Sequence, residues 1–298
     1  MHRLFPAFLV AGLTILFLTG RAANAKPLVV QASNYPAYYF AQRVATDSFD
    51  VRYRVPKAVD PAFWRPGDDD LIAFQQADII LLNGATYEKW LKMVTLPRSI
   101  MLDTSKDFSD QYLEYEGEVH QHGNGVAHSH GGTAMTTWLD FALAAKQAES
   151  IAERFTEEVP QDGAAIKERL AALQEDLKKL DDRMNAVAGA WGDKELIIAS
   201  HPVYQYLAKA YGFTLESMEW EWNTPLGEQE TAKLKALIDE HQARWMIWES
   251  SPTKDSQARI GQLGLKILVV SPCGNRIGDK DWLQIMHNNV LMLESIVK

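Results

Sequence analysis

The 298-residue chain contains a single cysteine, Cys273, so it forms no intramolecular disulfide and packing has to stabilise the fold. Basic residues are also few. Thirty Lys and Arg stand against 39 Asp and Glu, which gives a net charge of −9. A chain with this charge disfavours nucleic acid and other polyanions as partners and suits a cationic ligand.

Long apolar runs are confined to the N-terminus. A short basic start precedes the run "LFPAFLVAGLTILFL", and the small residues Ala23 to Ala25 follow. This pattern is typical of a secretory signal peptide, and the run is short for a spanning helix. No cysteine lies near to accept a lipid. We therefore expect residues 1–25 to be cleaved, leaving a soluble, monomeric periplasmic protein; loss of Arg3 and Arg21 without any acid lowers its charge to −11.

Catalytic signatures are missing as well. The sequence has no Gly-rich Walker loop, no Gly-x-Ser-x-Gly motif and no His-Glu-x-x-His motif. Cys273 lies in "SPCGN", where no neighbour in the sequence would lower its pKa. These absences favour a binding protein over an enzyme.

Strands and helices alternate in two parts of the chain. The first part contains the strand patterns "PLVVQAS", "FDVRYRVPKAV" and "ADIILLNG", with the helix "PGDDDLIAFQQA" before the third. The last part contains the strand patterns "KELIIAS", "RWMIWES" and "LKILVVS", separated and followed by helices. This order predicts an α/β fold with parallel sheets in two lobes of similar size.

One apolar stripe predicts a long helix between these parts. Its members recur at alternating steps of four and three: Ile166, Leu170, Leu173, Leu177, Leu180, Met184 and Val187. The helix would have about 24 residues and a length of roughly 36 Å; a coiled-coil partner is the alternative explanation. We expect an N-terminal lobe at 26–160, a connecting helix at 161–190 and a C-terminal lobe at 191–298, with a ligand cleft between the lobes.

Four of the eight histidines lie in one segment that interrupts the pattern, residues 115–133, which we predict to be a loop. They are His120, His122, His128 and His130. The His-x-His spacing occurs twice and suits two chelating pairs. The surrounding glycines lose much entropy on ordering, so this segment alone should bind metal with modest affinity.

The sequence resembles the zinc- and manganese-binding solute-binding proteins of ABC importers over nearly its whole length after the N-terminal segment. The resemblance rests on "VDPAFWRPGDDDLIAFQQADIILLNGATYEKWL", "TTWLD", "SHPVYQYLAKAYG", "IWESSP" and "VVSPCGN" in this order, with the His-rich segment where zinc importers of this type carry theirs. It implies two lobes joined by a rigid helix, a metal bound between them and a membrane permease as partner.

The metal ligands depart from the family pattern. By this resemblance, the first and second histidines fall on Ala62 and Thr136, and the final carboxylate falls on Ser271. His201 alone remains of the usual four. A methyl group donates no lone pair, and neutral hydroxyls are poor zinc ligands. The family's usual site therefore cannot form unchanged.

Three hypotheses follow. In the first, His128 or His130 enters the cleft and joins His201 and Glu249. In the second, the segment binds metal alone, through His120, His122, His128 and His130, while the cleft binds something else. In the third, the histidines are only a solvated loop.

Several of these side chains have structural alternatives. His201 could cap the next helix or bond a backbone carbonyl, and Glu249 could lie at a helix start. Asp60 and Asp140 are expected to brace loops through backbone N–H groups. Tryptophans near the cleft could stack on an organic or chelated-metal solute, although large aromatics more often fill space.

Overall, we expect a solute-binding protein for zinc, manganese or another divalent metal that delivers the ion to an ABC permease. A metal buffer or adhesin that uses only the His-rich segment is the alternative. Metal binding requires neutral imidazoles, so affinity is expected to fall below about pH 6.5.

Overall fold

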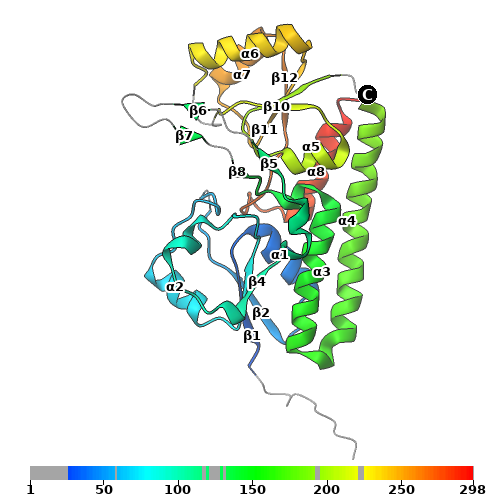
Figure 1. Cartoon of the computed structure of the whole chain (residues 1–298). Coiled ribbons are helices and arrows are strands. Elements are labelled where there is room, and N and C mark those ends of the chain that lie inside the picture. The colour runs from blue at the N-terminus through cyan, green and yellow to red at the C-terminus, as the bar shows by residue number, and fades with distance from the viewer. Residues whose placement is uncertain are drawn as a thin grey trace, which may run out of the picture.

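The computed structural model describes residues 26–57, 59–115, 119–120, 128–129, 132–191, 195–220 and 225–297, with the backbone alone at 119–120 and 128–129. Two α/β lobes lie one above the other, and one long helix runs beside both (Figure 1). Within these ranges, none of the helices combines the length and hydrophobicity that a bilayer-spanning segment needs.

The N-terminal lobe contains a four-stranded parallel sheet in the order β2-β1-β3-β4. Its strands are β1 Leu28–Ala32, β2 Phe49–Tyr53, β3 Ile79–Leu82 and β4 Met101–Asp103. Helices α1 Tyr35–Val44 and α2 Asp68–Gln75 belong to this lobe. The short 3₁₀ helices of this half are Lys89–Met93, Arg98–Ile100, Lys106–Gln111 and Thr137–Leu139.

The C-terminal lobe repeats this architecture with the strand order β10-β9-β11-β12, again parallel throughout. The strands are β9 Ile197–Ala199, β10 Leu215–Ser217, β11 Trp245–Trp248 and β12 Lys266–Val269. The helices are α5 Gln205–Tyr211, α6 Glu228–His241, α7 Lys254–Gln262 and α8 Trp282–Glu294. The predicted fold, two lobes with parallel sheets joined by a long helix, is confirmed.

Two long helices hold the lobes together. Helix α3, Phe141–Glu158, packs along helix α4, Gly163–Trp191, which also contacts α1 and α8; the 3₁₀ turn Pro160–Asp162 joins them. The stripe predicted from sequence is the buried face of α4, with six of its seven members fully buried and Leu170 partly so. Since this face packs within the chain, it needs no coiled-coil partner.

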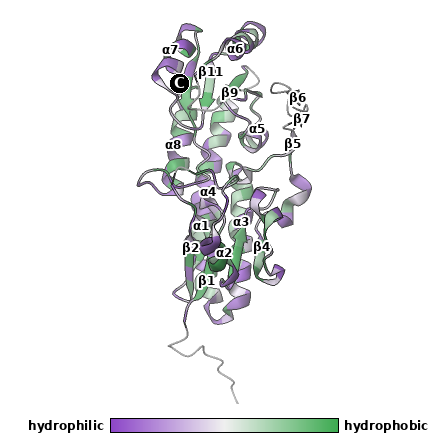
Figure 2. Ribbon diagram, turned by 90° about the vertical axis from the view of Figure 1, so that its left-hand side faces the viewer, coloured by the Kyte–Doolittle hydropathy of each residue, from purple (hydrophilic) through white to green (hydrophobic). Residues whose placement is uncertain are grey.

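A single hydrophobic cluster extends through both lobes. It contains Val30 and Ile79 from one sheet, Ile197 and Ile247 from the other, and Leu177 from α4. Two smaller clusters lie on the other faces of the two sheets. In Figure 2 the strands of both sheets are green, whereas α7 carries much purple, as expected for buried strands and a surface helix.

The sequence patterns missed α1, β4 and β10, and the loop prediction for 115–133 was incomplete. The root of that segment is a short antiparallel ladder between β5 Glu114–Tyr115 and β8 Gly132–Thr133. A second ladder joins β6 Val119–His120 to β7 His128–Ser129. Two-residue strands are too short to leave an alternating pattern in the sequence.

Candidate metal site

His201 and Glu249 lie side by side in the C-terminal lobe. His201 comes two residues after β9, and Glu249 comes directly after the adjacent strand β11. The His201 Nδ1 and Glu249 Oε1 atoms are 3.5 Å apart, and the two side chains are 31% and 33% exposed. Both residues were predicted from the sequence as separate candidates. They are in contact because β9 and β11 are neighbours in the sheet. Carboxyl ends of parallel strands are the usual ligand edge of such a sheet.

Neither residue caps a helix in the described part of the chain. Helix α5 begins after Tyr204 without a side-chain cap, so His201 does not cap it. Helix α7 is capped by Thr253, whose side chain accepts from the Ser256 N–H, so Glu249 is not at its start. Both side chains therefore remain candidates for binding a ligand.

Ala62, Thr136 and Ser271, the three positions that the sequence resemblance assigns to missing ligands, make other contacts. Ala62 is 2% exposed, and its N–H donates to Asp60 Oδ1 at 2.9 Å. The Thr136 hydroxyl donates to the Val203 carbonyl at 2.6 Å. The Ser271 Oγ accepts from the Cys273 N–H at 3.1 Å. None of the three can hold a metal as it stands.

Both aspartates brace backbone, as the sequence predicted. Asp60 accepts the Ala62 N–H, and Asp140 caps α3 by accepting from the N–H groups of Ala142 and Leu143. In the described part of the chain, no three His, Cys, Asp or Glu side chains lie close enough together to hold a metal ion. Of the histidines of the His-rich segment, His122 and His130 lie outside the described residues, and His120 and His128 are described by backbone alone.

The root of the His-rich segment is held close to His201. The Leu113 N–H donates to the Tyr206 hydroxyl at 3.4 Å, just before the β5–β8 ladder. After the ladder, Thr136 bonds to Val203, two residues beyond His201. The residues on both sides of the segment are therefore tied to the lobe that carries His201.

A strap from the C-terminal lobe, residues 272–276, crosses to the N-terminal lobe; we call it the interlobe clasp. The Trp138 indole N–H donates to the Pro272 carbonyl at 2.7 Å, and the Tyr35 N–H donates to the Gly274 carbonyl at 2.9 Å. The Asn275 side chain donates to the carbonyls of Pro56 and Val59 at 2.8 and 2.7 Å and accepts from the Tyr53 hydroxyl at 2.9 Å. These bonds tie the C-terminal lobe to the N-terminal lobe.

Arg276 completes the clasp. Its guanidinium carbon lies 5.8, 4.9 and 5.2 Å from the ring centroids of Tyr35, Tyr38 and Tyr53. The three rings lie within about 6 Å of one another, at 6.0, 5.9 and 5.7 Å. A cation over aromatic faces contributes about 0.5–2 kcal/mol, more when it is shielded from water.

Replacing Arg276 with alanine should therefore lower the free energy of unfolding by about 1–2 kcal/mol, measured by urea denaturation. Arg276→Lys should retain part of this, because it keeps the charge but not the planar group. Arg98→Ala, at an exposed arginine far along the chain, is the control. If Arg276→Ala and the control unfolded with the same free energy, the contacts between Arg276 and the three tyrosine rings would not stabilise the fold.

Glu88 is a buried carboxyl group in the N-terminal lobe. Its Oε1 accepts from the Ser33 hydroxyl and from the Asn83 N–H, both at 2.6 Å. Burial raises the pKa of Glu88 to about 7 despite these bonds. The Asn83 amide in turn donates to the Met135 carbonyl at 3.0 Å, next to Thr136. A buried titratable group is thus linked through Asn83 to the residue that precedes Thr136.

The tryptophans near the cleft fill space. Trp64, Trp138, Trp220 and Trp248 are each at most 6% exposed, so none of the four presents a ring to a solute; Trp222 lies outside the described residues. The Cys273 thiol is also buried, which raises its pKa to about 12 and leaves it protonated. Neither stacking on these rings nor thiolate chemistry is supported.

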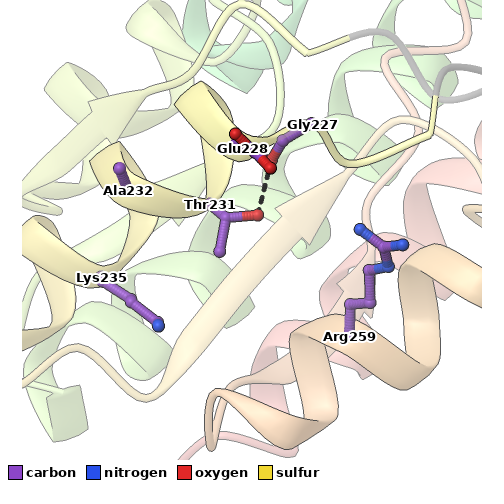
Figure 3. Close-up of a pocket in the computed structure, with 6 residues that line it drawn as sticks. All are labelled: Gly227, Glu228, Thr231, Ala232, Lys235 and Arg259. Carbon is purple, nitrogen blue, oxygen red and sulfur yellow. Dashed lines mark hydrogen bonds between the residues drawn. The ribbon is translucent and has the colours of Figure 1, made fainter.

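A cavity of about 360 Å³ lies elsewhere, between α6 and α7 (Figure 3). Its lining residues are Gly227, Glu228, Thr231, Ala232, Lys235 and Arg259. The Thr231 hydroxyl donates to the Gly227 carbonyl within α6, and Arg259 donates to the Leu226 carbonyl. These residues lie apart from the strand ends that carry His201 and Glu249.

The family model for the periplasmic zinc-uptake complex component A, ZnuA, matches residues 30–296. The chain belongs to this family. Among curated relatives, it is 23% identical over 304 residues to the zinc-binding lipoprotein AdcA of Streptococcus pneumoniae, covering 97% of this chain and 60% of AdcA. It is 27% identical over 247 residues to the manganese ABC transporter substrate-binding lipoprotein PsaA of Streptococcus pneumoniae, covering 79% of this chain and 75% of PsaA.

Solved structures of ZnuA-like proteins share the fold. The metal-dependent lipoprotein YcdH of Bacillus subtilis superposes with a TM-score of 0.76 at 21% identity, covering 91% of this chain and 98% of YcdH. The Zn(II)-bound ZnuA-like domain of Streptococcus pneumoniae AdcA gives a TM-score of 0.76 at 17% identity, with the same coverage. The resemblance inferred from the sequence motifs is confirmed at the level of family and fold.

Proposed function

We propose that this protein is the extracytoplasmic solute-binding component of an ABC importer for a divalent transition metal, with zinc as its principal cargo. The observation that carries this proposal is the pair His201 and Glu249 at the ligand edge of the C-terminal sheet, 3.5 Å apart and accessible. An imidazole nitrogen and a carboxylate oxygen are donors that zinc accepts in proteins. Family membership supports the same role.

The His-rich segment supplies a further nitrogen donor in this proposal. His130 and His128 precede Gly132 of the β5–β8 ladder by two and four residues. An extended chain spans about 3.3–3.6 Å per residue, so either residue reaches up to roughly 7–14 Å from that ladder. The residues that flank the segment are bonded to Tyr206 and Val203, in the lobe that carries His201, which supports this source for the further donor.

Cellular location and partner follow from the same reasoning. The N-terminal segment would direct export, and the protein would meet an ABC permease at the outer face of the inner membrane. AdcA and PsaA are named lipoproteins. The single cysteine of this chain, Cys273, is buried and far from the N-terminus, so it is no candidate for a lipid anchor there.

Metal analysis of protein purified without an affinity tag, followed by zinc titration, tests the proposal. We expect about one tightly bound zinc per chain. Deletion of residues 120–130 should keep this zinc but weaken its binding by about tenfold. This is less than the cost of losing a ligand on the sheet, because the deletion removes one nitrogen donor but also the entropy cost of ordering a glycine-rich segment. Changing the four histidines of the segment to asparagine, at constant length, should have the same effect.

The alternative of a metal buffer makes a different prediction. Within the described residues no group of three metal-binding side chains is assembled, and the four clustered histidines could act alone. In that case the deletion would abolish all zinc binding. If the deletion left the affinity unchanged, the His-rich segment would have no part in the site.

A further inference from the structure

The turn that carries His201 is bonded to the other lobe. Residues His201, Pro202 and Val203 form a tight turn in which the Val203 N–H donates to the His201 carbonyl at 2.9 Å. A proline at the centre suits such a three-residue turn, because its ring fixes φ at about −65°. The Val203 carbonyl accepts from the Thr136 hydroxyl at 2.6 Å. A hydrogen bond from the N-terminal lobe therefore reaches the turn of the proposed metal ligand.

The residue before His201 is fixed within the C-terminal sheet. The Ser200 N–H donates to the Ile247 carbonyl at 3.0 Å, and the Ser200 carbonyl accepts from the Trp220 N–H at 2.9 Å. Ser200 is buried, so both bonds are shielded from water. His201 follows these bonds directly, and the direction of its imidazole depends on the turn that comes next.

Thr136 is itself firmly supported. The Asn83 side chain donates to the Met135 carbonyl at 3.0 Å and accepts from the Thr137 hydroxyl at 3.3 Å, so it bonds the residues on both sides of Thr136. Asn83 is fully buried and comes directly after β3. Because Thr136 is held in this way by its own lobe, its hydroxyl can impose a position on Val203.

We propose that Thr136 is a positioning residue for the metal: its hydroxyl holds the His201 turn, so that the imidazole is placed for binding before the metal arrives. This inference rests on the proposed function and adds a residue that does not touch the metal. Residues that orient a ligand raise metal affinity, because less freedom is lost on binding. Since the bond joins the two lobes, affinity also depends on how they are placed relative to each other.

Zinc affinity of the whole protein, measured by competition with a chromophoric chelator, tests this inference. Thr136→Val removes the hydroxyl at nearly constant shape, and we expect zinc binding to weaken by about tenfold. Thr136→Ala removes the same bond and should match it, whereas Thr136→Ser keeps the hydroxyl and should restore most of the affinity. Thr156→Val is the matched control, because the Thr156 hydroxyl also donates to a carbonyl, at 2.8 Å, but within α3. It should leave the affinity unchanged.

A double-mutant cycle separates positioning of His201 from a general effect on the fold. If Thr136 acts through His201, Thr136→Val should have little further effect on zinc binding in the His201→Ala background. A purely structural role would weaken binding by the same factor in both backgrounds. The His201→Ala background is titrated against a weaker chelator, and thermal unfolding of each zinc-free variant shows whether it is folded at the assay temperature.

The outcomes distinguish the inference from the proposed function. A loss of about tenfold in Thr136→Val that serine restores, and that disappears in the His201→Ala background, supports the positioning role. Unchanged affinity in folded Thr136→Val and Thr136→Ala, no recovery with serine, or an equal loss in both backgrounds overturns it, while His201 remains a ligand. If His201→Ala itself binds zinc normally, the proposed function fails.

Discussion

Replacement of His201 with alanine is expected to weaken zinc binding by at least about 100-fold. Loss of a residue that merely orients a metal ligand costs about 10- to 100-fold, and loss of the ligand itself should exceed this. In the proposed site, His201 supplies the imidazole donor and adjoins Glu249. The measurement is a competition titration at neutral pH against a chelator of known affinity.

The control for this prediction is His241→Ala. His241 lies in the last turn of α6 and is 38% exposed, beside Glu240. It matches His201 in residue type and exposure but lies at the end of a surface helix. We expect its removal to leave zinc affinity unchanged. If the two variants bound zinc with equal affinity, the metal would not be bound at the strand ends that carry His201, and the proposed site would be wrong.

Replacement of Glu88 with glutamine should remove a large part of the pH dependence of stability. The pKa of Glu88 is raised from 4.5 to about 7 by burial, so the folded protein holds this proton more tightly than the unfolded chain. Its contribution is therefore fully present below about pH 4.5 and is lost as the pH rises through about 7. The full difference corresponds to about 3 kcal/mol.

Urea denaturation at a series of pH values measures this effect. The stability of the unchanged protein relative to Glu88→Gln should fall by about 3 kcal/mol between pH 4.5 and pH 8. Taking the difference cancels other carboxyls with raised pKa, such as Asp103. Glu153→Gln, at an exposed position on α3, should give a constant difference. A constant difference for Glu88→Gln as well would mean that its carboxyl ionises normally despite burial.

Periodicity and motif order were enough to predict the fold. The stripe on α4 depends on contacts within one helix, and strands such as β3 and β11 are continuous apolar runs, so each is visible locally. Helix α1 was missed because its ten residues include Pro36 and three tyrosines, which are not strong helix signals. Strands β4 and β10 have three residues each, too few to show a period.

The site could be predicted only in part. His201 and Glu249 were named because each follows an apolar strand, but their contact depends on which strands are neighbours. No sequence pattern predicted the interlobe clasp, because the residues that it joins are far apart in the chain. Tyr53 and Asn275, for example, are separated by 222 residues.

The hydrophobic cluster that extends through both sheets bears on how such a protein can change over evolutionary time. Ile79 and Ile247 belong to different lobes but share this cluster with α4, so a poorly packed substitution in one lobe also weakens the other. The lobes are therefore not interchangeable modules, and a hybrid that took each from a different relative would need its shared interior redesigned. The strand ends carry no such constraint, which leaves ligand positions open to relocation while the scaffold stays fixed.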